Sequence, residues 1–555
     1  MVLTLFIVAV VCFALAYRFY GSYLARLYGI KDANPTPAHA MFDNVDYCPA
    51  KPTILFGHHF SSIAGAGPIV GPIIAAIAFG WLPAFLWVIL GCILIGSVHD
   101  FSALIASIRH KARNVAEIAK QYMSMRAWRL FLSFTLLALI YVLVVFIDLT
   151  SSTFVMNEGV ASASVIYIAL AIGFGFSIYR LKIPTLWGSL IFVPLVFLGA
   201  VLGQFIPFPT HFFEIFGISP VKGWDILLVT YCYIASVTPV WILLQPRDYL
   251  SSYLLYASVL AGFFGILFGN FTLSYPAFVG FSAPHLGPLF PILFITVACG
   301  AISGFHSIIA SGTTAKQLDK ESHAQPIGYG GMLVEGLVAV IAITTVILVA
   351  KGDPLAGRPP LEIYGTGIGK FLSVFGVPAN FGFAMGLLAL STFILTTLDT
   401  ATRLGRYMLQ ELFGLEGRNI RYLTSLVVLV LPAILVLINL KDAAGNPMPA
   451  WKLIWPVFGA TNQMLAGLVL LAVTVWLKKT GKKFYFTLIP MVFMMIMTLW
   501  ALVILISQYK FSLIGIIAAV LFALAILLVI EAFRSLISKG TLPPEAIESA
   551  VESET

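Results

Sequence analysis

The second long apolar run of the chain contains the sequence Gly57-His58-His59-Phe60-Ser61-Ser62-Ile63-Ala64-Gly65-Ala66-Gly67-Pro68-Ile69-Val70-Gly71-Pro72, with three glycines and two prolines in its last eight residues. Proline removes a backbone donor, and glycine weakens a helix. At mid-depth in a bilayer, unpaired backbone is tolerated only where protein or a water-filled cavity covers it. We therefore predict two half-helices around an unwound joint, with Pro68 in the first turn of the second half.

Such a joint suits the recognition of an anion. Free amides between Gly65 and Gly67 would lie beside the positive end of a helix dipole, which favours a bound carboxylate. A glycine-rich packing face with a proline kink is the alternative interpretation, and it is common in membrane bundles. The density of helix breakers here favours the broken helix. The predicted substrate site includes His58, His59, Ser62, Gly65, Ala66, Gly67 and Pro68.

The composition excludes a water-soluble protein. Of the 555 residues, 60% are hydrophobic and 10% are charged, and the mean hydropathy is +0.98, whereas soluble domains carry about 25% charged residues. No long polar tract separates the apolar runs, so we predict one transmembrane domain over residues 1–555, with a short cytoplasmic tail at 540–555. The first run, at 3–27, lacks a basic n-region and a cleavage site, and it is predicted to be a retained span.

Apolar runs long enough to cross about 30 Å of hydrocarbon predict fifteen transmembrane helices. They fall near 3–27, 60–80, 82–107, 130–152, 160–179, 184–206, 224–244, 251–270, 290–311, 328–350, 371–398, 421–440, 453–476, 484–506 and 511–533. Most basic residues lie at the odd-to-even turns, among them Arg109, Arg180, Arg247, Lys316 and Lys478. The positive-inside rule then places the N-terminus outside and the C-terminus in the cytoplasm of a cell-membrane protein. The net charge of +8 is an orientation signal and does not predict a nucleic-acid partner.

A second irregular span follows five crossings later, at Ile234-Ala235-Ser236-Val237-Thr238-Pro239-Val240-Trp241. It runs in the opposite direction, and broken spans in two inverted halves indicate a transporter with a midplane site. We predict a first repeat at 57–206 and a second at 224–398, with an extra N-terminal helix and about four additional helices at 421–535. Ser236, Thr238 and Trp241 are predicted to join the substrate site.

Several ordered motifs resemble one known family. They are residues 57–72 with Trp81-Leu82-Pro83-Ala84 and His99-Asp100-Phe101, then Phe305-His306-Ser307 with Ser311-Gly312-Thr313-Thr314, Thr397-Leu398-Asp399-Thr400-Ala401-Thr402-Arg403, and Trp455-Pro456-Val457-Phe458-Gly459-Ala460-Thr461-Asn462-Gln463. The chain resembles the carbon starvation protein A (CstA) family. This resemblance implies a transporter of the amino acid–polyamine–cation superfamily, with a LeuT-like core of five-plus-five inverted repeats and peptides or pyruvate as substrates. It also implies a sodium site in which Ser311 or Thr314 joins the carbonyls of Ile63 and Ala66.

Titratable residues inside apolar runs are the candidates for ion coupling, because burying an unpaired charge in a membrane is costly. Hydrogen bonding between helices without a transport role is the alternative for each. The candidates are His99, Asp100, Asp148, His306 and Glu335, with the hydroxyls of Ser311 and Thr314. A proton is the predicted driving ion, with sodium as the alternative. Asp399 and Arg403 are spaced for an i,i+4 ion pair, with a structural or gating role.

The resulting functional prediction is ion-coupled import of a small carboxylate such as pyruvate, in response to carbon starvation. Short peptides are the second choice, and they require an anionic partner for the ammonium group, which Asp100 or Asp148 could supply. A nutrient sensor with a transporter fold is a further alternative. No paired catalytic set of an intramembrane enzyme is present in the sequence, so an enzyme is not predicted, nor is a cofactor.

Overall fold

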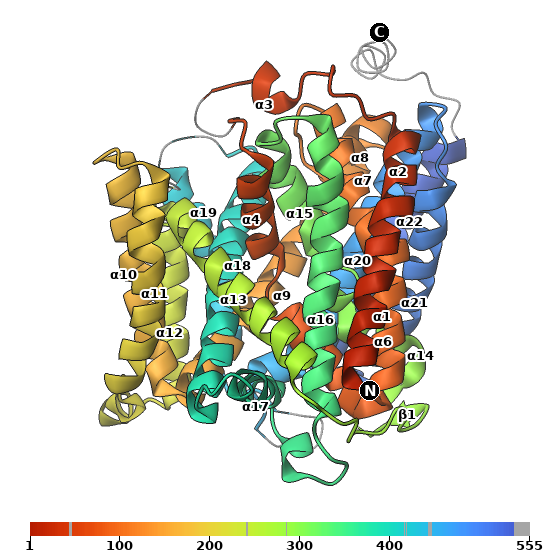
Figure 1. Cartoon of the computed structure of the whole chain (residues 1–555). Helices are drawn as coiled ribbons and strands as arrows, with labels where there is room; N and C mark the ends of the chain where they lie inside the picture. The colour runs from red at the N-terminus through yellow and green to blue at the C-terminus, as the bar shows by residue number, and fades with distance from the viewer. Residues whose placement is uncertain are drawn as a thin grey trace.

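The computed structural model describes residues 1–43, 47–239, 242–284, 286–415, 417, 419–441 and 447–537. These residues form an almost entirely helical protein (Figure 1). In the part of the chain described, the single sheet pairs β1 (Ser282–Ala283) with β2 (Gly287–Pro288). The predicted all-α polytopic fold is therefore confirmed.

The α-helices follow one another along the whole chain. They are α1 (Val2–Leu15), α2 (Ser22–Tyr28), α3 (Pro37–Ala40), α4 (Pro52–Ile63), α5 (Gly67–Phe79), α6 (Trp81–Gly91), α7 (Ser97–Arg109), α8 (Val115–Tyr122), α9 (Met125–Met156), α10 (Glu158–Tyr179), α11 (Thr185–Phe205), α12 (Pro220–Val237), α13 (Leu244–Phe268), α14 (Leu289–Val297), α15 (Gly304–Gly312), α16 (Gly330–Ile347), α17 (Pro360–Ser373), α18 (Ala379–Phe413), α19 (Ile420–Leu437), α20 (Ala450–Lys479), α21 (Tyr485–Tyr509) and α22 (Leu513–Ile537). Short π and 3₁₀ segments are η1 (Ala16–Gly21), η2 (Cys92–Gly96), η3 (Thr210–Phe212), η4 (Glu214–Phe216), η5 (Ala298–Gly300), η6 (Thr314–Lys316), η7 (Glu321–His323), η8 (Gln325–Tyr329) and η9 (Pro354–Gly357).

The number of spans agrees closely with the sequence prediction. By length and composition, 13 helices of the described residues could cross a membrane, or 14 with the bent pair α4 and α5 counted as one span. The run predicted at 224–244 is α12, whose 18 residues are about 27 Å long. Helix α12 packs against α9, α18 and α19. With α12 included, the count reaches the predicted fifteen.

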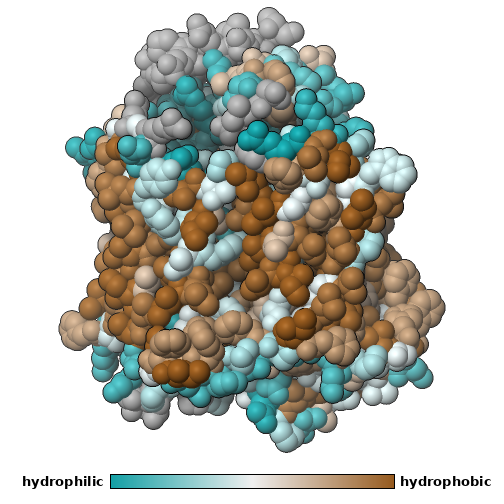
Figure 2. Space-filling view, turned by 90° about the vertical axis from the view of Figure 1, so that its left-hand side faces the viewer, coloured by the Kyte–Doolittle hydropathy of each residue, from teal (hydrophilic) through white to brown (hydrophobic). Residues whose placement is uncertain are grey.

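The surface is that of a membrane protein. Figure 2 shows a broad band of apolar residues around the middle of the molecule and polar residues at both ends. The N-terminus and the last residues of α22 lie at opposite ends (Figure 1), as an odd number of crossings requires. We call the end at which α1 begins the N-terminal face and the opposite end, where α3 and α8 lie, the α3 face.

The predicted break in the second span is confirmed. Helix α4 ends at Ile63, and Ala64 leaves the helical region with ψ of 71°. Helix α5 begins at Gly67 with Pro68 in its first turn, as predicted. The two half-helices are bent by 48° relative to each other.

A second discontinuous span packs against the first, but it is not the one predicted. Helix α14 ends at Val297, Ala298 has a φ of +33°, and α15 starts at Gly304. A Cβ atom at Gly71 of α5 would lie 2.4 Å from the Thr296 carbonyl oxygen, so α5 and α14 approach each other by their backbones. The span predicted to break at 234–241 instead ends as a helix at Val237. The repeat bounds 57–206 and 224–398 remain a prediction.

The span predicted at 371–398 also begins later than expected. Residues from Pro360 to Ser373 form α17, a separate helix that lies at the N-terminal face (Figure 1). Helix α18 starts at Ala379, directly after Pro378, and runs for 35 residues. Pro378 is the N-cap of α18, and proline disfavours the helical conformation in the residue before it, which separates α18 from α17.

Candidate functional site

The break between α4 and α5 lines a small cavity in the centre of the molecule. The cavity has a volume of about 10 Å³ and is lined by Ile63, Gly65, Gly67, Val142, Phe146, Cys299, Ser303, Phe305, Thr397, Phe458 and Asn462. This volume holds about one water molecule. The cavity at the break therefore has no room for a substrate in this structure.

The backbone at the break is partly free. Gly65 donates its amide to the Ile63 carbonyl oxygen at 2.8 Å, so this amide is not available, contrary to the sequence prediction. Among the described residues, no acceptor pairs with the amides of Ala66, the N-cap of α5, and Gly67, its first residue. A Cβ atom at Gly67 would lie 2.4 Å from the Cys299 Cβ atom, so this glycine is also required for packing.

Four titratable side chains form a continuous buried chain beside the break, which we call the inner titratable chain. His99 and Asp100 come from α7, His306 from α15 and Glu335 from α16, and all four are fully buried. The Asp100 carboxylate lies 2.7 Å from Nδ1 of His99 and 2.7 Å from Nδ1 of His306. Nε2 of His306 is 3.1 Å from the Glu335 carboxylate, as an ion-pair contact without hydrogen-bond alignment. Four of the five titratable residues predicted for ion coupling therefore meet at one place.

His59 connects the first half-helix with the elements that carry this chain. Its Nδ1 atom lies 2.9 Å from the hydroxyl oxygen of Thr314, and its imidazole is fully buried. A Cβ atom at Gly331 of α16 would lie 3.4 Å from the imidazole Cδ2 atom. His59 is thus held between η6 and α16, one turn before the carboxylate of Glu335 along α16.

The hydroxyls predicted for a sodium site have partners within the protein. Ser311 donates to the Ser307 carbonyl oxygen at 2.7 Å, and Thr314 bonds to His59. Ser62, predicted for the substrate site, donates to the His58 carbonyl oxygen at 2.8 Å. In the described residues, no group of three histidine, cysteine or acidic side chains has the geometry of a metal site. A sodium site at Ile63, Ala66, Ser311 and Thr314 remains a prediction.

A second buried network surrounds Arg247, and we call it the arginine network. The guanidinium of Arg247 is fully buried and contacts the carboxylates of Asp399 and, at 3.1 Å, Asp248. It also donates to the Tyr231 hydroxyl at 2.7 Å, and Tyr231 donates to Asp399 at 3.0 Å. Nδ1 of His58 lies 3.5 Å from Asp248. Arg247 was predicted to lie in a cytoplasmic turn, and the structure corrects this because α13 begins at Leu244 and carries it inward.

The arginines of α18 bind backbone carbonyls, and the expected ion pair between Asp399 and Arg403 is not formed; their structural or gating role remains a prediction. Arg403 does not pair with Asp399 but donates to the carbonyl oxygens of Ala235 and Thr238 at 2.7 and 2.8 Å. Arg406 donates to the Ser236 carbonyl oxygen at 2.9 Å. These are carbonyls of the last turn of α12, whose free acceptors and negative dipole end favour a cation.

Ser236 and Thr238, also predicted for the substrate site, lie away from the central cavity. The Ser236 hydroxyl pairs with the Ser425 hydroxyl at 2.9 Å, and Thr238 donates to the Ile234 carbonyl oxygen at 2.6 Å. Neither residue lines the cavity. Trp241 lies outside the described residues. Their role in substrate binding remains a prediction.

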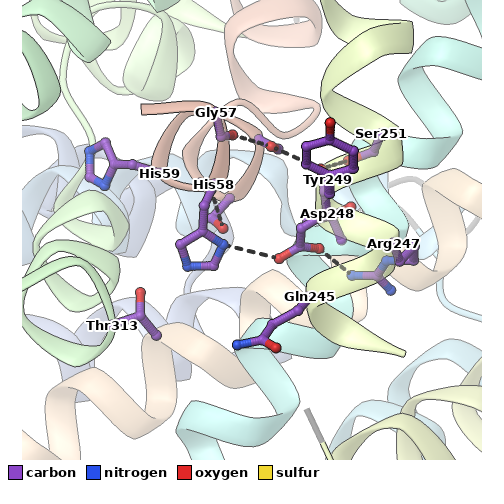
Figure 3. A network of polar contacts seen from close by, with 12 residues as sticks. Gly57, His58, His59, Gln245, Arg247, Asp248, Tyr249, Ser251 and Thr313 are labelled. Carbon is purple, nitrogen blue, oxygen red and sulfur yellow. Dashed lines mark hydrogen bonds and ion pairs between the residues drawn. The ribbon is translucent and has the colours of Figure 1, made fainter. Parts of the chain in front are cut away.

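Adjacent histidines of α4 therefore face different networks. Figure 3 shows His58 directed toward Asp248 and Arg247, and His59 on the other side of the helix. Sequence reasoning did not identify Arg247, Asp248 or Tyr231, although Arg247 and Asp248 directly precede an apolar run.

Asp148 is separate from the inner titratable chain. It lies near the C-terminal end of α9 and accepts a hydrogen bond from the backbone amide of Trp451 at 2.9 Å. Trp451 is in the first turn of α20, so the carboxylate satisfies a helix terminus. Ion coupling at Asp148 remains a prediction.

The comparison with known proteins agrees with these features. The model of the family described as carbon starvation protein CstA matches residues 1–356 and 354–501. The chain belongs to the CstA family. A relative named peptide transporter CstA, from Escherichia coli (strain K12), is 32% identical over 89% of this chain and 80% of its own length. The pyruvate/proton symporter BtsT of the same organism is 31% identical over 89% of this chain and 80% of its own length. The structure of MhsT in complex with L-phenylalanine aligns with a TM-score of 0.46 at 13% identity, over 88% of this chain and 99% of that chain.

Membership of the CstA family agrees with the functional class predicted from the sequence. The curated relatives are named as transporters. The chain is accordingly a multi-pass membrane protein of a transporter family, and the prediction that it is not an enzyme is confirmed.

Proposed function

We propose that this CstA-family protein is a proton-coupled importer of a small carboxylate such as pyruvate. It acts in the cytoplasmic membrane, with its N-terminus outside and its C-terminus in the cytoplasm. The inner titratable chain is the observation that carries this proposal. Two carboxylates and two imidazoles at hydrogen-bond or ion-pair distance inside a membrane protein are the elements from which proton relays are built.

The geometry supports proton movement through His306. Its two ring nitrogens face different carboxylates, Nδ1 facing Asp100 and Nε2 facing Glu335. An imidazole can accept a proton on one nitrogen and release it from the other. A proton that enters or leaves this chain changes the charge beside His59, and therefore the electrostatic energy of α4. Movement of α4 relative to α5 would open the closed cavity at the break.

The state of the acidic residues favours a carboxylate over a peptide. A peptide needs an anionic partner for its ammonium group, and Asp100 and Asp148 were the candidates. Asp100 already contacts two imidazoles, and Asp148 accepts the amide of Trp451. The amides of Ala66 and Gly67 can still receive a carboxylate. Short peptides remain the second candidate, because the peptide transporter and pyruvate symporter relatives are 32% and 31% identical to this chain.

The hydrogen-bond partners of these side chains also favour a proton over sodium as the driving ion. The Ser311 and Thr314 hydroxyls are engaged within the protein, whereas the titratable groups are in direct contact with one another. Sodium coupling would require these hydroxyls to exchange their present partners for the ion.

Purified protein in liposomes tests the proposal directly. We expect labelled pyruvate to accumulate when the outside is acidic, and a protonophore to abolish accumulation. Asp100→Asn should allow downhill flux but remove the pH dependence, while Asp353→Asn, at an exposed loop position, should behave as wild type. Accumulation that follows a sodium gradient would refute the proton as driving ion. Accumulation that occurs only with dipeptides would refute the small carboxylate as substrate. Binding without any flux would favour the nutrient sensor.

A further inference from the structure

Asp225 of α12 is a buried carboxylate that belongs neither to the inner titratable chain nor to the arginine network. Its side chain is fully buried, near the end of α12 that begins at Pro220. The Ser151 hydroxyl of α9 donates to its Oδ1 atom at 2.7 Å. Its Oδ2 atom has no hydrogen-bond partner among the described residues. One neutral hydroxyl is a poor substitute for the hydration that an ionised carboxylate loses.

The charged groups around Asp225 do not neutralise it. Asp148 lies on α9 one turn before Ser151, on the same face of that helix, and carries a like charge. Lys222 lies one turn before Asp225 on α12, but its ammonium binds the carbonyl oxygens of Val436 and Ile438 at the end of α19. Among the described residues, the other basic side chains of the neighbouring segments, those of His211 in η3, Lys441 and Lys452, are exposed.

These surroundings determine which carboxyl group keeps a proton. Two neighbouring carboxylates in a site of low polarity do not both ionise. The Trp451 amide and the positive end of α20 stabilise the anion at Asp148. Asp225 has neither, and an isolated buried charge is among the most costly groups in a protein interior. The proton therefore stays on Asp225.

We propose that Asp225 is a proton-binding residue near the N-terminal face, paired with an ionised Asp148. If the proton coupling proposed above is correct, Asp225 is the outer proton site of the cycle, and the inner titratable chain is the inner one. The two sites lie toward opposite faces of the protein. Asp225 is close to the start of α12, at the N-terminal face, whereas His306 is in α15, which leads to the α3 face (Figure 1).

Infrared spectroscopy tests the proton itself. The difference spectrum of wild type minus Asp225→Asn, in lipid at neutral pH, should contain the C=O stretching band of a protonated carboxyl group, shifted in D₂O. Asp225→Glu should restore this band. A difference spectrum with only the bands of an ionised carboxylate would overturn the proposal, and its result does not depend on which substrate the protein transports.

Transport assays test the role of the proton. Asp225→Asn should lose accumulation driven by a pH gradient while it retains exchange of labelled for unlabelled substrate, and Asp353→Asn should retain both. Undiminished accumulation by Asp225→Asn would overturn the role as the outer site. A wild-type protein that accumulates substrate without a proton gradient would instead refute the proposed function, and the infrared result would stand.

Discussion

At the scale of single residues, the buried charges are arranged so that each has a partner or shares a proton. Arg247 is the clearest case, since its guanidinium is fully buried and touches two carboxylates from α13 and α18. Removing one member of a buried pair leaves an uncompensated charge, and this is more costly than the pair itself is stabilising. The arginine network is therefore expected to be necessary for the folded state of the core.

Arg247→Ala should destabilise the protein by about 3–5 kcal/mol, because Asp248 and Asp399 would both lose their cation. Thermal unfolding in detergent, followed by intrinsic fluorescence, measures the effect. Arg113→Ala is the matched control, because Arg113 is 52% exposed and its pair with Glu117 is worth at most about 1 kcal/mol. Equal melting temperatures for the two variants would contradict a structural role for the arginine network.

At the scale of helices, the two discontinuous spans determine where the centre of the molecule lies. Their contact needs glycine, because a Cβ atom at Gly67 or Gly71 of α5 would collide with Cys299 or with the backbone of α14. Gly67 therefore contributes to packing as well as to the free backbone at the break. A substitution at this position tests both roles only if the packing is restored in a second variant.

Gly67→Ala should destabilise the protein by roughly 1–3 kcal/mol through overpacking. Adding Cys299→Gly removes the side chain that the new methyl group meets at 2.4 Å, and should recover most of the loss. Thermal unfolding of the single and double variants, with uptake measured in parallel, provides the comparison. If the double variant is stable and still takes up no substrate, Gly67 also acts in the substrate site. A double variant as unstable as the single one would contradict the proposed contact between Gly67 and Cys299.

The sequence predicts the first break but not the second, for a physical reason. Pro68 and Gly65 act locally on the helix in which they occur, so their effect can be read without tertiary structure. The break after Val297 contains a single glycine, Gly300, and no proline; it depends on contact with α5, which a single sequence does not reveal. The meeting of Asp100, His306 and Glu335 is equally non-local, because the three residues come from three different helices. Each residue could be identified as a candidate for ion coupling, because an unpaired titratable group inside a membrane is costly. The contact between them could not be predicted.

At the scale of the whole molecule, the residues that follow α2 are held at the α3 face by contacts with residues 321–322. Glu321 receives hydrogen bonds from the Lys31 amide and the Asn34 side chain and pairs with Arg109 at 3.0 Å. Asp32 accepts two hydrogen bonds from Ser322, and these lower the pKa of Asp32 below its usual value. A lowered pKa means that this stabilisation is complete above the ordinary value, near pH 4, and is lost only as the pH falls through the lower folded-state value. The pH dependence of uptake near neutrality is therefore not expected to come from Asp32.

Glu321→Gln should loosen the loop after α2 without unfolding the core, because it removes the charge that Arg109 requires while keeping the shape of the side chain. Limited proteolysis with trypsin should then cut faster at Lys31. Glu362→Gln provides the control, since Glu362 of α17 pairs only at 3.9 Å, with the exposed Arg358 that precedes this helix. Cleavage at Lys31 that is unchanged in Glu321→Gln would show that other contacts hold the loop.

The two halves of the broken span are expected to differ in mobility, and this difference is what a transport cycle requires. Helix α5 is almost entirely buried and meets α14 through its glycines. The start of α4 is more exposed, at its N-cap Lys51 and at Ile54 in its first turn. Hydrogen–deuterium exchange should therefore be faster in α4 than in α5. Since α4 touches the arginine network through His58 and packs through His59 against η6 and against α16, which carries Glu335, its exchange should change with pH and with pyruvate, and Asp100→Asn should remove the response to pH. Equal protection of α4 and α5 under all conditions would mean that the span moves as one body, and opening of the central cavity would then require a different moving element.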